Sequence, residues 1–139
     1  MSDPPARDGE DWLHRHTARE WLAAAVTELS KAEGAYAQND ARGGLAGARR
    51  AAGMALNGVL AAAPDASFGR TYMEHLTALG RDASAPTAVR AAATTLLTTR
   101  APGGGVIGLR SRSGDTRVLE AAKDVLAHAY ALIARTESA

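Results

Sequence analysis

The sequence has no cysteine, so neither disulfide bonds nor thiolate metal sites can stabilise it. Aromatic residues make up only 4% of its 139 residues, and no run approaches the roughly 20 apolar residues of a membrane span. The first residues carry Asp and Glu where a signal peptide has a basic and then an apolar stretch. We therefore expect a soluble, cytoplasmic protein of one domain that is stabilised by an ordinary hydrophobic core.

The charge composition is balanced but strongly biased towards arginine. The formal net charge is +1, so no overall field attracts the chain to nucleic acid. Lys31 and Lys123 are the only lysines, and arginine is the better ligand for phosphate. A coding sequence rich in Ala, Gly and Arg explains the same bias, so composition alone does not identify a phosphate-binding protein.

The stretch 40–63 predicts a long helix around which the other elements are arranged. Its apolar residues, from Leu45 onwards, recur at the spacing of one helical stripe, and many Ala and Gly residues flank that stripe. Asp40 is a suitable N-cap, and Pro64 ends the pattern. Because small residues allow neighbouring helices to approach on several sides, we expect this helix at the centre of a bundle.

A first helix is predicted over 17–37. Thr17 and Glu20 have the Thr-x-x-Glu spacing of a capping box. The predicted apolar stripe, which we expect to face the central helix, consists of Leu22, Val26, Leu29 and Tyr36. The connection to the central helix is short, so the two helices should be antiparallel neighbours.

Two helices follow the central one. A short helix is predicted over 70–79. The next helix has Ser84 as a candidate N-cap and Pro86 in its first turn, and it extends to about Thr99. Apolar residues on one side of each helix predict that both pack against the bundle.

The last helix is predicted over 117–134, with Asp115 or Thr116 as its cap. It has the most regular apolar stripe in the chain. The glycine-rich stretch 102–114 that precedes it shows no helical pattern, and we expect it to be the most mobile internal segment.

The chain contains no strand pattern of useful length. The sequence therefore predicts an all-α, antiparallel up-and-down bundle of four main helices plus one short helix. Residues 1–10 are polar and predict a disordered N-terminal tail, and 11–139 form a single helical domain.

The glycine-rich stretch contains two possible phosphate-binding features. Its glycines satisfy G-x-G-x-x-G, but a dinucleotide site needs a strand before that motif and a helix directly after it. Arg110, Arg112 and Arg117 lie beside the start of the last helix, where free amides also attract anions. Asp115 would repel an anion there, so a solvated loop remains the alternative.

Arg70 and His75 form the candidate catalytic pair. They are five positions apart in the short helix, so both can approach one face of it. An arginine that neutralises phosphate and a histidine that transfers a proton suffice for RNA cleavage without a metal. The same spacing arises by chance in a chain with many arginines, which is the alternative interpretation.

The other histidines suggest no site. His14 and His16 point to different faces of a helix, and no Cys or carboxylate completes a metal-binding set. His128 follows Asp124 by four positions, as in an ordinary surface pair on a helix. The sequence predicts neither a metal nor a cofactor.

The order of these pieces resembles the HEPN (higher eukaryotes and prokaryotes nucleotide-binding) domain family over about residues 17–135. The similar segments are A-x-x-E-L-x-x-A at 25–32, ALNGVL at 55–60, HLTAL at 75–79 and EAAKDVLAHAYALI at 120–133. The resemblance implies a helical bundle that is usually dimeric. Some members are ribonucleases with an Arg followed four to six residues later by a His, a formula that Arg70 and His75 fit. In nuclease members that Arg is commonly followed by Asn or another polar residue and the motif begins a later helix, whereas here Thr71 follows the Arg and the motif lies early in the chain.

Other members lack the motif and act as partners of a nucleotidyltransferase or as binding modules. We therefore expect a homodimeric binding module for a partner protein, such as a nucleotidyltransferase or antitoxin, or for a nucleotide or RNA phosphate. The alternatives are a metal-independent ribonuclease of toxin type, using Arg70 and His75, and a purely structural interaction protein.

Overall fold

The computed structural model describes residues 12–101 and 112–138, without the side chains at 112 and 113. The predicted tail 1–10 and most of the glycine-rich stretch 102–114 lie outside these residues. Within them the chain is all-α, with five α-helices, one 3₁₀ turn and no strand. The elements are α2 (Ala18–Ala37), α3 (Ala41–Ala62), η2 (Ala66–Phe68), α4 (Tyr72–Gly80), α5 (Thr87–Thr98) and α6 (Arg112–Ser138).

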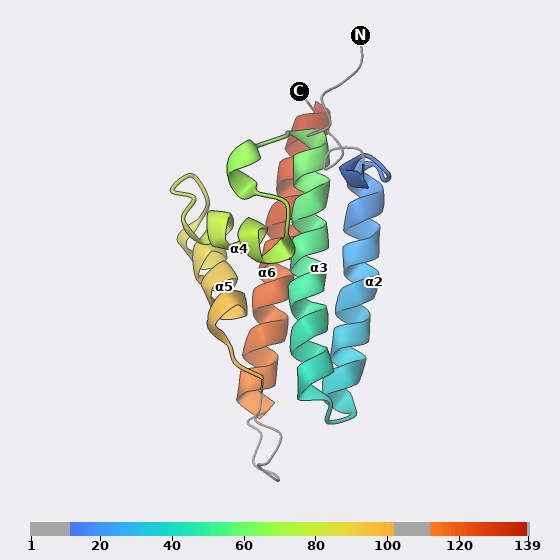
Figure 1. Ribbon diagram of the computed structural model, residues 1–139, viewed down its shortest axis with the longest axis vertical. Coiled ribbons are helices and arrows are strands. Elements are labelled where there is room, and N and C mark those ends of the chain that lie inside the picture. Colours follow the sequence, from blue (N-terminus) through green and yellow to red (C-terminus); the bar gives the residue numbers. More distant parts are fainter. Residues whose placement is uncertain (1–11, 102–111, 139) are drawn as a thin grey trace.

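The three long helices α2, α3 and α6 lie side by side along the length of the molecule, and α4 and α5 cover one flank (Figure 1). α3 contacts α2, α6, α4 and α5, so the prediction of a central helix is confirmed. A connection of three residues reverses the chain between α2 and α3, which makes them an antiparallel hairpin.

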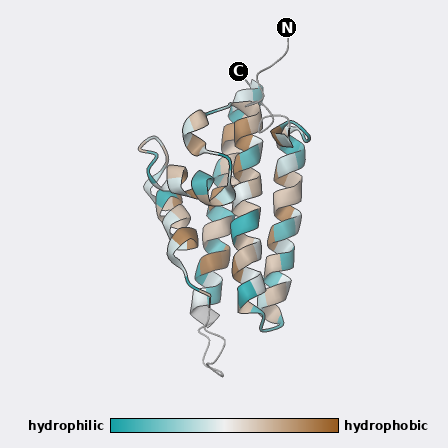
Figure 2. Cartoon of the chain, in the orientation of Figure 1, coloured by the Kyte–Doolittle hydropathy of each residue, from teal (hydrophilic) through white to brown (hydrophobic). Residues whose placement is uncertain are grey.

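The composition of α3 explains its central position. The Asp40 carboxylate accepts a hydrogen bond of 2.8 Å from the peptide N–H of Gly43, which caps the helix as predicted. Gly44 lies against the ring of Tyr36 in α2, and Gly53 lies against the ring of Tyr72 in α4. Figure 2 shows mostly pale colours over α3, because its many Ala and Gly residues are neither strongly apolar nor strongly polar.

The capping box of α2 is confirmed, because Thr17 and Glu20 exchange side-chain and peptide hydrogen bonds. The prediction that Val26 faces α3 is wrong, since 56% of its surface is exposed. Ala25 and Ala32 are buried instead, beside the predicted Leu29. Because α2 and α3 approach each other closely, alanines lie at the middle of the buried face of α2. Val26 lies outside that face.

The start of α4 differs from the prediction. Arg70 lies before the helix, and Thr71 is the N-cap of a second capping box with Glu74. Ser84 is not the cap of α5, because its N–H and hydroxyl both bond the carboxylate of Asp82 in a tight turn. Pro86 occupies the N-cap position of α5.

A long-range contact fixes the other end of α5. The Arg49 guanidinium of α3 donates hydrogen bonds of 2.6 Å to the carbonyl oxygens of Leu96 and Thr99, and a longer one to Leu97. These carbonyls belong to the last turn of a helix, where no intrahelical partner is available. Arg49 therefore caps α5 from a neighbouring helix.

α6 is longer than predicted at both ends. It begins at Arg112, so Asp115 lies in its first turn and neither Asp115 nor Thr116 is the cap. An acidic residue in a first turn suits the positive end of the helix dipole. The apolar stripe of α6 is buried, as at Val118, Val125 and Ile133. No helix within the described ranges is both long and apolar enough to cross a membrane.

Candidate functional site around His75

His75 is buried, with only 1% of its surface exposed, between three elements. Its Nδ1 lies 2.7 Å from the carbonyl oxygen of Phe68 in η2, and its Nε2 lies 2.8 Å from Oδ1 of Asn57 in α3. Asn57 is itself completely buried. The imidazole thus connects α4 to both η2 and α3.

The two contacts determine which protons the pair carries. A neutral imidazole has a single N–H, but here two oxygen atoms face its two nitrogens. Burial lowers the pKa of His75, which favours the neutral ring. Nδ2 of Asn57 is buried with no hydrogen-bond partner among the described residues. A half-turn of the Asn57 amide lets Nδ2 donate to Nε2 while Nδ1–H donates to Phe68, so we assign this arrangement to the neutral pair.

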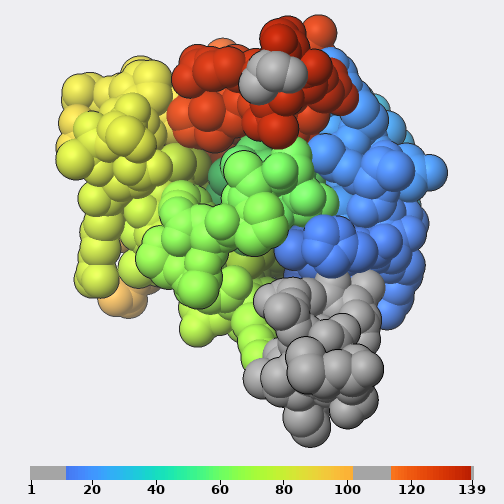
Figure 3. Space-filling model, turned by 90° about the horizontal axis from the view of Figure 1, so that it is seen from above, coloured from blue at the N-terminus to red at the C-terminus, as the bar shows by residue number. Residues whose placement is uncertain are grey.

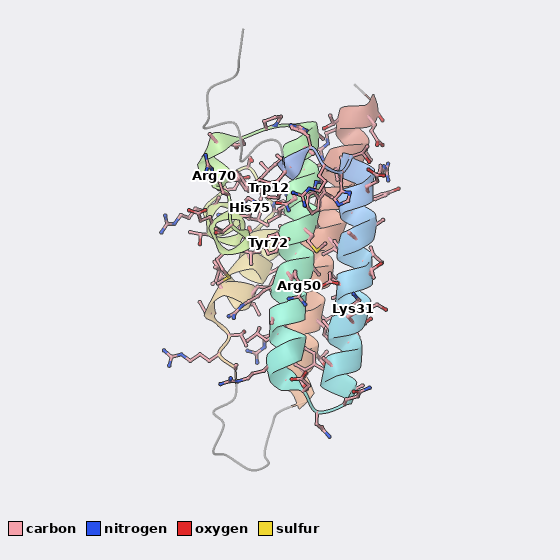
Figure 4. The ribbon with its side chains drawn as sticks, turned by 45° about the vertical axis from the view of Figure 1, so that its right-hand side comes forward. Trp12, Lys31, Arg50, Arg70, Tyr72 and His75 are labelled. Atoms are coloured by element: carbon pink, nitrogen blue, oxygen red, sulfur yellow. The ribbon has the colours of Figure 1, made fainter. Side chains whose placement is uncertain are left out.

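Arg70 and His75 do not share a helix face, because Arg70 precedes α4 and His75 lies within it. The Arg70 peptide N–H donates to Oε1 of Glu74 at 2.9 Å, and its side chain is exposed. Figure 4 shows Arg70 at the junction of η2 and α4, and His75 nearer α3. One residue of the candidate catalytic pair is therefore at the surface and the other in the interior.

Glu74 organises the start of α4. Its Oε1 accepts from the N–H groups of Arg70 and Thr71, and Thr71 Oγ1 accepts from the Glu74 N–H. These hydrogen bonds hold the pKa of the Glu74 carboxyl below its ordinary value. Glu74 is therefore a carboxylate at neutral pH, four residues after Arg70 and directly before His75.

Tyr72 occupies the space that Gly53 leaves on α3. Burial raises the pKa of its hydroxyl, and its ring centre lies 6.5 Å from that of His75.

On the adjoining crossing of α2 and α3, Glu28 forms ion pairs with Arg50 and Lys31, which lower the pKa of its carboxyl. Lys31 and Arg50, both labelled in Figure 4, therefore share the carboxylate of Glu28 as their partner.

An open groove of about 680 Å³ lies along the outer side of α4. Its walls are η2 and the turn between α4 and α5, seen as the green and yellow segments in Figure 3. Carboxylates line it at Asp65, Glu74 and Asp82, together with the cation of Arg81. The groove is thus more acidic than basic.

The predicted anion site lies largely outside the described residues. Arg110 is not described, and of Arg112 only the backbone, which begins α6, can be placed. Arg117 is exposed on α6. The phosphate-binding role of these three arginines therefore stays a prediction.

The remaining histidines are dispersed. The ring of His16 meets Trp21 edge-on with ring centres 4.8 Å apart, and His14 is exposed. His128 is half-buried, and burial lowers its pKa while the nearby carboxylate of Asp82 opposes that shift. In the parts of the chain that the structure describes, no three His, Asp or Glu residues are grouped to hold a metal ion.

Comparisons of the chain with models of protein families, with curated proteins and with solved structures found no match. The residues of the site must therefore be interpreted from their chemistry.

Two features of this region were missed by sequence reasoning. Asn57 was seen only as part of an apolar helix, although a lone polar residue on a buried stripe signals an internal hydrogen bond. The groove is bordered by two Asp-Ala-Ser tripeptides, 65–67 and 82–84, each forming a turn in which Asp bonds Ser. That repeated tripeptide was the available signal.

Proposed function

We propose that the chain is a HEPN-like, homodimeric binding module whose partner is a protein. The order of the motifs along the chain and the central position of the Ala-rich helix α3 support this family resemblance. A nucleotidyltransferase or an antitoxin as the partner follows from that resemblance alone. The chemistry of the described surface favours protein over phosphate as the ligand.

The observation that carries the proposal is the use of both His75 ring nitrogens inside the protein. A general base must reach the proton that it abstracts, directly or through one water molecule. His75 instead contacts Phe68 and Asn57 and is 1% exposed. The ribonuclease alternative, with Arg70 and His75, requires α4 or η2 to move first, so binding is the simpler function.

The groove beside α4 supports a protein ligand for an electrostatic reason. Among the described residues that line it, three are carboxylates and Arg81 alone is basic, so a phosphate would be repelled. Binding of a nucleotide or RNA would need another surface, such as the one that Arg110, Arg112 and Arg117 predict.

The seam between α2 and α6 supports the homodimer. Val26 on α2 and Tyr130 on α6 are exposed by 56% and 52%. Arg19, two turns before Val26, lies with its guanidinium 5.0 Å from the Tyr130 ring centre and pairs with Glu137 of α6. Val26 and Tyr130 would add apolar area to a contact between two copies of the chain, so we propose this seam as the dimer interface.

The test is to purify the tagged full chain from its own cells, with and without nuclease treatment. We expect a stoichiometric protein partner that survives the nuclease. Co-expression with the products of adjacent genes then identifies it. Recovery of nucleic acid alone would overturn the proposal, as would degradation of RNA by the purified chain that an Arg70→Ala variant abolishes.

A further inference from the structure

The groove along α4 has the form of a site for a peptide segment, and this inference rests on the proposed protein-binding function. It is open to solvent, about 680 Å³ in volume, and bounded by η2 and by the turn after α4. Its walls therefore come from segments on both sides of α4 in the sequence, and hydrogen bonds within each turn fix their shape.

Its apolar part is contributed by Phe68 and Met73. Met73 is 41% exposed, which it shares with few other large apolar side chains among the residues that the structure describes, and Phe68 is partly buried against the core. Methionine adapts its shape to different apolar partners. These two residues offer an apolar contact within the groove.

Its charged part is fixed by hydrogen bonds that do not neutralise it. Asp65 accepts from the N–H and hydroxyl of Ser67, and Asp82 accepts from the same two groups of Ser84. The hydrogen bonds from Ser67 lower the pKa of Asp65. In the same way, hydrogen bonds from peptide N–H groups lower the pKa of Glu74. The negative charge of the groove is therefore ordered before any ligand binds.

We infer that this groove binds a basic amphipathic segment of the partner protein, with its Lys or Arg side chains at Asp65, Glu74 and Asp82 and an apolar residue on Met73 and Phe68. The complementary charge selects this occupant, because an acidic segment or a phosphate would meet three carboxylates. The preformed turns reduce the entropy lost on binding.

The probe is an amphipathic peptide of Leu and Arg, compared with its counterpart of Leu and Glu. Binding to the full chain is followed by amide chemical shifts at two salt concentrations. We expect shifts concentrated at residues 65–84, an affinity that falls as salt rises, and no binding of the Glu peptide. Shifts confined to the seam of α2 and α6 would overturn the inference.

Two matched pairs of variants make the test specific. Asp65→Asn/Glu74→Gln/Asp82→Asn keeps the hydrogen-bond acceptors of the turns and of the capping box, and should weaken the peptide by about ten-fold or more. Glu20→Gln/Glu120→Gln/Asp124→Asn makes the same change of net charge elsewhere and should bind like wild type. Equal affinity of the two triple variants would contradict the inference.

The second pair is Met73→Ser, which removes the apolar contact and should weaken the peptide, and Met73→Leu, which keeps an apolar side chain there and should not. It decides the question even if the triple variant folds poorly, and equal affinities of this pair would again count against the groove. The result also separates the two proposals. A nuclease-resistant partner whose binding survives these changes would leave the proposed function intact and remove only the groove.

Discussion

Asn57 and His75 meet in the interior at 2.8 Å, eighteen residues apart in the sequence, and this contact joins α3 to α4. Both side chains are buried and polar, so their hydrogen bond decides the protonation of the imidazole. A histidine that the sequence offers as a catalytic residue is thus held by a neighbouring amide in the interior. Several measurable properties depend on this pair.

The first prediction concerns the tautomer of His75. At pH 7.5 we expect Nδ1 to carry the proton and Nε2 to accept from the Asn57 amide. An Asn57→Asp variant places a carboxylate beside Nε2, which should protonate that nitrogen and raise the pKa of His75 above its wild-type value. Long-range ¹H–¹⁵N NMR spectra of the ring measure both states. A wild-type ring with a proton on Nε2 would show that the assignment is wrong.

The second prediction concerns stability against pH. Because burial lowers the pKa of His75 in the folded state, the unfolded chain binds a proton below about pH 6.5 that the folded chain does not. This residue should therefore reduce stability as the pH falls from about 6.5 towards the folded-state pKa, and contribute no pH dependence above about pH 6.5. The unfolding free energy of wild type and of His75→Gln can be measured with urea at a series of pH values. Plotted against pH, the two sets of free energies should differ in slope only in that acidic range. Parallel curves throughout would contradict the prediction.

The third prediction compares two glycines within helices. Nothing lies within 4 Å of the position that a Cβ at Gly34 would occupy, so Gly34→Ala should stabilise the chain by about 0.5 kcal/mol. A Cβ at Gly53 would lie 2.3 Å from the ring of Tyr72, so Gly53→Ala should destabilise it by about 1–3 kcal/mol despite the better helix propensity. Urea midpoints measure both, and changes of the same sign would refute the packing argument.

The fourth prediction concerns the cap that Arg49 provides for α5. Arg49→Ala removes the donor to the carbonyls of Leu96 and Thr99 and should cost about 1–3 kcal/mol of unfolding free energy. Arg42→Ala is the control, since Arg42 is an exposed arginine two turns earlier on the same helix. Hydrogen exchange should accelerate in the last turn of α5 only in the Arg49 variant.

The fifth prediction concerns assembly. Val26→Glu places a charge on the exposed seam of α2 and α6 and should convert a homodimer to a monomer without unfolding it. Thr27→Glu, an exposed neighbour one helical position further round, is the control and should leave the dimer intact. Light scattering at high micromolar concentration measures the mass, and a monomeric wild type would remove this prediction.

Local signals explain what could be predicted from the sequence. The capping box at Thr17 and the N-cap at Asp40 are contacts over three residues, so their residue types suffice to predict them. The ends of α6 were underestimated because its first and last turns are polar and carry no apolar period. Val26 was misplaced because apolar spacing does not show which edge of a stripe a neighbouring helix covers.

The candidate site was less accessible to sequence reasoning. The five-residue spacing of Arg70 and His75 suggested one helix face, but the capping box at Thr71 starts α4 after the arginine. The partners of His75 come from Asn57 and Phe68, and the burial of a side chain among such distant residues depends on how the helices pack. Local periodicity contains no information about those contacts.

The close contacts of α3 also constrain how this protein can evolve. Gly47 faces Ala32 of α2, and Gly58 faces both the Ala18 carbonyl and Ile133 of α6, so larger side chains are excluded on two sides. Gly53 and Gly58 should therefore seldom be replaced even by Ala, whereas exposed positions of α2 and α6 outside the seam of Val26 and Tyr130 are free to diverge. Homologues would then retain the small-residue pattern of this helix long after their surfaces, and the ligands bound there, had changed.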